Sequence, residues 1–161
     1  MRYPGLHGDP PSIASEAASG AAALDGYVVE DQVGFLLRRA NQRHTAIFQD
    51  GMAGADLTPT QFTALIKVSE IGRVTQNHLG RLTAMDPATI QGVVRRLIDR
   101  ELVSRTTDPL DRRTVVLAPT QAGLALAADA VVAARRITDA TLDPLTQQEQ
   151  HQLVALLRKI S

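Results

Sequence analysis

The sequence predicts a mainly α-helical fold that carries one small β-hairpin. Apolar residues recur at spacings of three and four along most of the chain, which is the period of an amphipathic helix. The period falls to two only after Leu102, where short strands are expected. With 161 residues, of which 44% are hydrophobic, the chain is long enough for one domain or for a unit that a second copy completes.

The N-terminal part of the chain begins without any apolar period. Gly, Pro, Ser and Ala dominate it, so residues 1–29 are expected to form a flexible arm. From Gln32 the apolar spacing predicts a helix that ends at Gly51. Residues 58–61, Thr-Pro-Thr-Gln, supply a capping box with proline at the first helical position. They predict a second helix, which Gly72 closes.

Two further helices follow in quick succession. Thr75 is expected to cap a short helix that runs to about Ala84, and Asp86 a longer one that begins at Pro87. Only Met85 and Asp86 separate them, which is the spacing of a helix-turn-helix. The longer helix has an apolar side for the core and an outward side made of Ala88, Thr89, Gln91, Gly92, Arg95 and Arg96.

A hairpin and a long helix come next. Residues 102–106 and 114–117 alternate as strands do, and the turn 107–113 joins them into a wing. Pro119 and Thr120 then open an Ala-rich helix that ends between Thr138 and Leu142.

The last helix is expected to begin with a second capping box, residues 146–149. Its apolar ridge consists of Leu153, Leu156, Leu157 and Ile160. Periodicity alone allows two interpretations of this ridge, a contact with a second copy of the chain or ordinary packing within one chain.

The charge distribution and the cysteine content restrict the classes of function that the protein can have. The whole chain balances 17 basic against 17 acidic residues, but residues 73–113 carry eight arginines, no lysine and five acidic residues. Arginine suits bidentate contacts with phosphate and guanine, although an ordinary salt-bridged surface remains the alternative. The absence of cysteine excludes disulfides, thiolate metal sites and thiol-based peroxide sensing.

This order of helices, helix-turn-helix, wing and two final helices resembles the MarR family of bacterial regulators. Residues 108–113, Asp-Pro-Leu-Asp-Arg-Arg, match the family's wing pattern. The apolar strand 115–118, followed by Thr120 and Gly123, matches the start of the next helix. The resemblance extends from about Val33 to Ile160.

The resemblance implies a winged helix-turn-helix DNA-binding domain at residues 58–118. It also implies a helical dimerisation region formed by residues 30–57 and 119–161, with the ridge of the last helix at the dimer interface. The protein is thus expected to be a homodimer whose partner is double-stranded DNA with an inverted repeat.

The candidate DNA contacts lie on the helix-turn-helix and the wing. The helix that begins at Pro87 is expected in the major groove, where the Gln91 carboxamide is suited to pair with adenine. Gly92 departs from the family tendency towards a larger polar residue and removes one potential base contact. The resemblance implies that Arg113 enters the minor groove and that Asp111 orients it. The other candidates, for thymine methyls or phosphates, are Gln76, Asn77, Ala88, Thr89, Arg95, Arg96 and Arg112.

A ligand site is suggested by the first long helix. His44 lies on an otherwise apolar face, and a core histidine satisfied by hydrogen bonds is the simplest interpretation. The stretch also resembles MarR-type regulators that sense aromatic acids, in which an arginine and a histidine six residues later engage the ligand; here these are Arg38 and His44. Phe48 and Phe62 would provide the apolar wall.

The expected function is a cytoplasmic repressor that an aromatic carboxylate, or its coenzyme A thioester, releases from a palindromic operator. The alternatives are a regulator of efflux or stress resistance with a broad phenolic response, and a DNA-binding protein without a ligand or sequence preference. No cofactor or metal is expected. No membrane segment is expected either, because no apolar stretch reaches the length of a membrane span and no apolar segment follows Arg2. An enzyme is not expected either, since phosphate-loop, nucleotide and metal-ligand motifs are absent.

Overall fold

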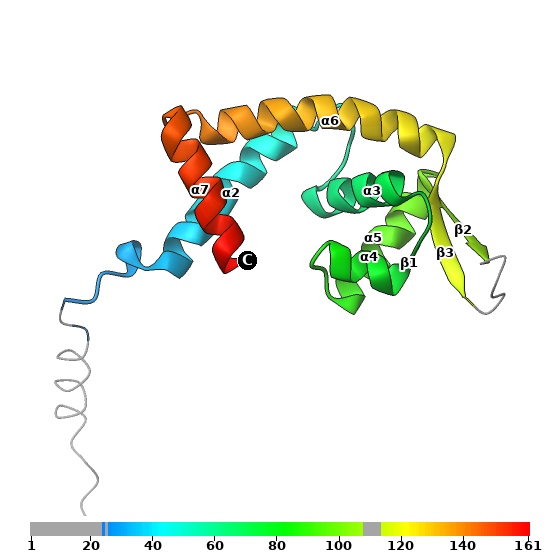
Figure 1. The fold of residues 1–161 in the computed structure, drawn as a ribbon, viewed down its shortest axis with the longest axis horizontal. Helices are drawn as coiled ribbons and strands as arrows, with labels where there is room; N and C mark the ends of the chain where they lie inside the picture. Colours follow the sequence, from blue (N-terminus) through cyan, green and yellow to red (C-terminus); the bar gives the residue numbers. More distant parts are fainter. Residues whose placement is uncertain (1–23, 25, 108–113) are drawn as a thin grey trace, which may run out of the picture. The chain divides into compact units, whose positions relative to one another are not determined.

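The computed structural model describes residues 24, 26–107 and 114–161 (Figure 1). The chain forms two compact units, residues 1–39 and 40–161. In the described part of the first unit, the 3₁₀ helix η1 (Val29–Asp31) precedes the start of α2 (Val33–Gly51). The sequence did not predict η1, because three residues are too few to show a period.

The second unit contains the remainder of α2 and all later elements. The helix-turn-helix consists of α3 (Pro59–Ile71), α4 (Gln76–Leu82) and α5 (Pro87–Asp99). A three-stranded antiparallel sheet has the order β1 (Val74–Thr75), β3 (Val115–Pro119), β2 (Val103–Thr107). The chain ends with α6 (Gln121–Leu142) and α7 (Gln147–Ile160).

The structure confirms the predicted hairpin and adds a strand to it. Strand β1 pairs with β3, with Val74 opposite Leu117 and Thr75 opposite Val116. The two residues of β1 show no alternation, so the sequence did not predict this strand. The short strand holds the start of α4 next to the base of the wing.

The predicted caps are confirmed. The Thr58 hydroxyl accepts from the Gln61 amide at 3.3 Å, and Gln61 Oε1 accepts from the Thr58 amide at 2.9 Å. Thr75 caps α4, and Thr146 with Glu149 forms the capping box of α7. These side chains satisfy backbone N–H groups that the first turn of a helix leaves without partners.

The start of α6 closes against the end of α5. The Thr120 hydroxyl donates to the Glu101 carbonyl at 2.7 Å, and Glu101 has a left-handed backbone with φ of 56°. A Cβ at Gly123 would lie 2.0 Å from the Leu102 carbonyl oxygen, so only glycine permits this approach. The spacing of Thr120 and Gly123 therefore serves helix packing in this chain.

The core lies between the helix-turn-helix, the sheet and α6, which runs across α3 and the sheet in Figure 1. Its largest fully buried side chains are Met52, Leu65, Val68, Leu79, Ile90, Leu97, Val103 and Leu117. Among the described residues, no helix is long and apolar enough to span a membrane.

Candidate nucleic-acid interface and effector site

Helix α5 exposes a polar side, and its opposite, apolar side is buried in the core. Ile90, Val93, Val94 and Leu97 are each at most 5% exposed, so both valines belong to the buried side. Ile98, the next apolar residue of the helix, is only half-buried. The six predicted outward positions are all exposed: Ala88, Thr89, Gln91, Gly92, Arg95 and Arg96. Burial of one side therefore holds the opposite side in a defined orientation.

The first turn of α5 is ordered by Asp86. Its Oδ1 accepts from the amides of Ala88 and Thr89, each at 2.9 Å, and its Oδ2 accepts from the Thr89 hydroxyl at 2.6 Å. The hydroxyl and then the amide of Thr89 hold the pKa of the Asp86 carboxyl below its usual value. Because the Thr89 hydroxyl hydrogen is already used, this residue offers an acceptor oxygen and a methyl group to an incoming partner.

Two neighbouring arginines of α5 differ in their partners. Arg95 Nε lies 3.8 Å from Asp99 Oδ2, an exposed contact that contributes little to stability. The Arg96 side chain has no hydrogen-bond or ion-pair partner within the described ranges. The alternative of an ordinary salt-bridged surface thus describes Arg95, which lies near Asp99, and not Arg96.

The start of α4 and the wing strands form a polar groove. Gln76 and Asn77 line a cavity of about 390 Å³ together with Arg105 of β2. Arg105 also lines a second cavity with Gln91 and Arg95. Sequence analysis missed Arg105, which the sequence marks only as one of the eight arginines between residues 73 and 113. The wing-tip residues Asp111, Arg112 and Arg113 lie outside the described residues.

Three of the four predicted ligand residues meet in one cluster. The ring centroids of His44 and Phe48 are 6.2 Å apart, and those of Phe48 and Phe62 are 5.7 Å apart in an edge-to-face arrangement. Phe48 is 4% exposed. This aromatic cluster, His44–Phe48–Phe62, joins α2 to α3.

One hydrogen-bond chain determines the tautomer of His44. The Thr141 hydroxyl donates to the Ile137 carbonyl at 2.7 Å, so its only hydrogen is used. His44 Nδ1, which lies 3.0 Å from the Thr141 oxygen, must therefore carry the hydrogen of that contact. In neutral His44, Nε2 is left as an acceptor.

The arginines near His44 have different surroundings. The Arg43 guanidinium donates to the carbonyls of Thr141 and Ala140 and so caps the C-terminal end of α6. The predicted Arg38 lies in the other compact unit, where its guanidinium carbon is 5.2 Å from the centroid of the Phe35 ring. Arg38 therefore stays a prediction as a ligand residue.

The ridge of α7 stays largely exposed among the described residues. Leu153, Leu156, Leu157 and Ile160 are 37%, 50%, 39% and 68% exposed, and no residue of α7 is buried. This exposure does not fit a fully buried intramolecular core, and the contact with a second copy stays a prediction. Within the described ranges, no three His, Cys, Asp or Glu side chains gather as they would around a metal ion.

Known proteins are similar to this chain in sequence and fold. Residues 57–115 match the MarR family. The chain is 41% identical over 150 residues to the HTH-type transcriptional repressor NicR of Pseudomonas putida, covering 92% of this chain and 95% of NicR. A probable transcriptional regulator from Pseudomonas aeruginosa is 48% identical and has a TM-score of 0.81 over 83% of this chain and 100% of that chain.

A second solved structure is that of BpsR from Bordetella bronchiseptica, whose DNA binding is regulated by 6-hydroxynicotinic acid. It is 41% identical, with a TM-score of 0.79 over 83% of this chain and 96% of BpsR. The extent of the match to NicR, together with the family match across the helix-turn-helix and wing, establishes the relationship: this chain belongs to the MarR family.

Proposed function

We propose that this protein is a dimeric transcriptional repressor that binds an inverted-repeat operator and is released by a small aromatic carboxylate. The observation that carries the proposal is the exposed polar and basic face of α5, whose opposite side is anchored in the core. The likeness to the repressor NicR over nearly the whole chain supports it.

In this proposal, residues 58–118 bind DNA and residues 30–57 with 119–161 form the dimer. The exposed ridge of α7 packs against the same ridge of a second copy, which removes its leucines from water. The dimer places two copies of α5 in successive major grooves of one duplex.

The DNA contacts follow from the exposed side of α5. Gln91 reads an adenine edge, while Ala88 and Thr89 meet thymine methyls or phosphates. Gly92 allows the backbone to approach closely. Phosphates are held by Arg95 and Arg96, and by Gln76 and Asn77 at the start of α4 together with Arg105. The wing contributes Arg112 and Arg113, with Asp111 orienting Arg113 in the minor groove.

The proposed effector is an aromatic ring with both a carboxylate and a hydroxyl group, of the kind that regulates BpsR. Phe48 and Phe62 would contact the ring, and the acceptor Nε2 of His44 would receive the hydroxyl hydrogen. Because the cluster joins α2 to α3, a ligand there changes the spacing of the two α5 helices and disfavours the operator-bound dimer.

The protein acts in the cytoplasm, where its operator is, and performs no catalysis.

An efflux or stress-resistance regulator with a broad phenolic response is the second candidate. The favouring observation is the apolar character of the Phe48–Phe62 contact, which selects for ring shape more than for substituents.

The test uses 6-hydroxynicotinic acid and a duplex selected for binding. The acid should release the purified dimer from DNA, whereas the uncharged amide of the same ring should not. His44→Ala should raise the acid concentration needed for half-release by about tenfold, the effect of losing one charge-assisted or buried hydrogen bond. His151→Ala, which changes an exposed histidine of α7, is the matched control.

Release by the amide and by unrelated phenols at similar concentrations would favour the second candidate. Binding to every duplex with equal affinity would refute the repressor proposal itself.

A further inference from the structure

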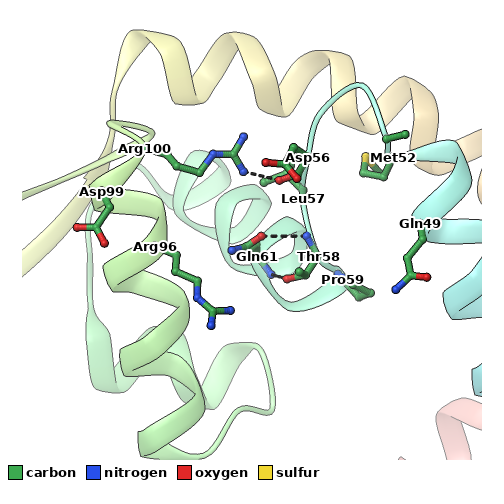
Figure 2. A pocket seen from close by; sticks show the side chains of 11 residues that line it. Gln49, Met52, Asp56, Leu57, Thr58, Pro59, Gln61, Arg96, Asp99 and Arg100 are labelled. Carbon is green, nitrogen blue, oxygen red and sulfur yellow. Dashed lines mark hydrogen bonds between the residues drawn. The ribbon is translucent and has the colours of Figure 1, made fainter.

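The loop that joins α2 to α3, residues 52–57, is bound to α5 by one side chain. The half-buried Arg100, at the C-terminal end of α5, donates from its guanidinium to the carbonyl of Asp56 and, at 3.0 Å, to that of Ala55. Figure 2 shows the side chain reaching from the end of α5 to Asp56. These two bonds form the Arg100 contact. Within the described ranges, no other hydrogen bond joins this loop to α5.

The loop itself is well fixed. Met52 and Leu57, which are 1% and 6% exposed, anchor its two ends in the core. The Met52 carbonyl accepts from the amides of Ala55 and Asp56 at 3.0 and 3.1 Å. Asp56 has a left-handed backbone with φ of 49°, which is unfavourable for a residue other than glycine, and the Arg100 contact offsets part of this cost. The loop is therefore expected to move as one body.

The end of α5 is held from a second side by the start of α6. The Leu102 amide donates to the Leu97 carbonyl at 2.9 Å and so closes the last turn of α5. The next contact is made by the Thr120 hydroxyl, which donates to the Glu101 carbonyl at 2.7 Å. A displacement of the loop therefore turns α5 about its contact with α6.

The loop connects the two helices that carry the aromatic cluster. The Phe48 carbonyl accepts from the first amide of the loop at 2.9 Å, and Phe62 lies at the start of α3. A change in the 5.7 Å separation of the two rings therefore displaces the loop. Apolar packing between α3 and α5 has little directional preference, whereas two bonds from one planar guanidinium fix both distance and direction.

We propose that Arg100 is a positioning residue that couples the aromatic cluster to α5. That the cluster is the effector site, and α5 the DNA-reading helix, rests on the proposed function. Displacement of the loop pulls on the C-terminal end of α5, and the 13-residue helix, about 20 Å long, carries the rotation to its first turn at Asp86. The outward side of α5 then leaves the orientation that the operator requires.

The first experiment measures the coupling between effector and DNA. The dissociation constant for the selected duplex is measured without 6-hydroxynicotinic acid and at saturating acid, and the ratio of the two values is compared between the parent and Arg100→Met. Methionine retains an apolar stem without the guanidinium. The ratio should fall towards one by about tenfold. A merely structural role would weaken DNA binding equally in both conditions and leave the ratio unchanged.

Arg43 provides the matched control. Its guanidinium also donates to two successive carbonyls, those of Thr141 and, at 3.1 Å, Ala140, but it ties α2 to α6 and not to α5. Arg43→Met should therefore keep the ratio of the parent when the acid is saturating. Arg100→Lys keeps the charge without the planar pair of donors, so its ratio should be intermediate.

A second experiment needs neither effector nor DNA. Phe48→Leu alters the cluster from the α2 side, and the backbone amide signals of Gln91 and Arg95 in ¹⁵N-labelled protein report whether the change reaches α5. These signals should shift when Arg100 is present and shift much less in the Arg100→Met background. His44→Gln, at a half-buried position of the same cluster, takes the place of Phe48→Leu if that variant does not fold.

Three results would overturn the inference. The first is an unchanged ratio in Arg100→Met when the acid does release the parent, which leaves the repressor proposal standing. The second is an equal loss of coupling in Arg43→Met and Arg100→Met. The third is a shift at Gln91 and Arg95 that is as large without Arg100 as with it. An acid that fails to release the parent contradicts the proposed effector instead, and the amide shifts then decide the role of Arg100.

Discussion

Helices α5 and α7 have the same sequence pattern and different surroundings. Each has a carboxyl group in its capping interaction whose pKa is lowered: that of Asp86, the N-cap of α5, by Thr89, and that of Glu149, in the capping box of α7, by Thr146. Each carries an apolar stripe at helical spacing. The stripe of α5 is at most 5% exposed in Ile90, Val93, Val94 and Leu97, whereas that of α7 is between 37% and 68% exposed in Leu153, Leu156, Leu157 and Ile160.

The difference shows that an apolar period predicts which side of a helix avoids water, but not which chain covers it. The α5 stripe is covered by the α3 and sheet side chains of its own chain. The α7 stripe has no such cover within the described residues, and the proposed dimer supplies it. Four predictions test this contrast.

The largest expected effect is on the α5 stripe. Leu97→Ala should lower the free energy of unfolding by about 2–5 kcal/mol, because it leaves a cavity in a core where Leu97 is completely buried. Chemical denaturation of variant and parent at matched protein concentration measures the loss. Leu124→Ala, at a 41% exposed position of α6, is the control and should cost far less. Equal losses in the two variants would mean that the α5 stripe is not the core.

The next effect is on the α7 stripe. Leu156→Glu should raise the dissociation constant of the dimer by about 30-fold or more, because a charge would be buried at an interface. Sedimentation across a range of concentrations measures this constant. Ile71→Glu, at a 43% exposed position of α3 outside the proposed interface, is compared with it. A chain that is monomeric before any substitution would remove the contrast between the helices altogether.

A smaller effect is expected on the outward side of α5. Gln91→Ala should reduce the preference for the selected duplex over a base-substituted one by about 1–3 kcal/mol, the contribution of one bidentate base contact. Affinity for unrelated DNA should change little, since that affinity comes from phosphate contacts. Titrations of the three duplexes at one salt concentration give the comparison, and an equal loss on all of them would make Gln91 a phosphate contact.

The smallest expected effect is the pH dependence of the capping carboxylates, for which variants of α5 and α7 should behave alike. Thr89 lowers the pKa of Asp86 from 3.8, so the stabilisation by its charge is complete above that pH and is lost as the pH falls through the lower folded value. The melting temperatures of the parent and Asp86→Asn should therefore differ near neutral pH and converge below pH 3.8. Glu149→Gln should converge below 4.5 for the same reason. A difference that grows on acidification would contradict this assignment.

Sequence analysis predicted the helices well because their ends carry local chemistry. The N-cap side chain of each of these helices accepts a hydrogen bond from the backbone of its first turn. These residues are Thr58, Thr75, Asp86, Thr120 and Thr146. Strand β1 was missed because its two residues depend on a pairing with β3 that no local pattern encodes. The close approach of Gly123 to Leu102 also involves distant residues, and only the family resemblance pointed to it.

The site was predicted less completely than the fold. The outward side of α5 follows from its period, and the meeting of His44, Phe48 and Phe62 agrees with the prediction. The contact of Arg43 with the end of α6 and the position of wing residue Arg105 beside α5 depend on tertiary packing. The roles of these residues in binding DNA or ligand stay predictions.

The most direct test of the account is selection of binding sites from a pool of random duplexes by the purified protein. Two α5 helices held by one dimer should enrich an inverted repeat whose half-site centres are about 10–10.5 base pairs apart. Enrichment of a single unpaired half-site, or of no sequence at all, would contradict it.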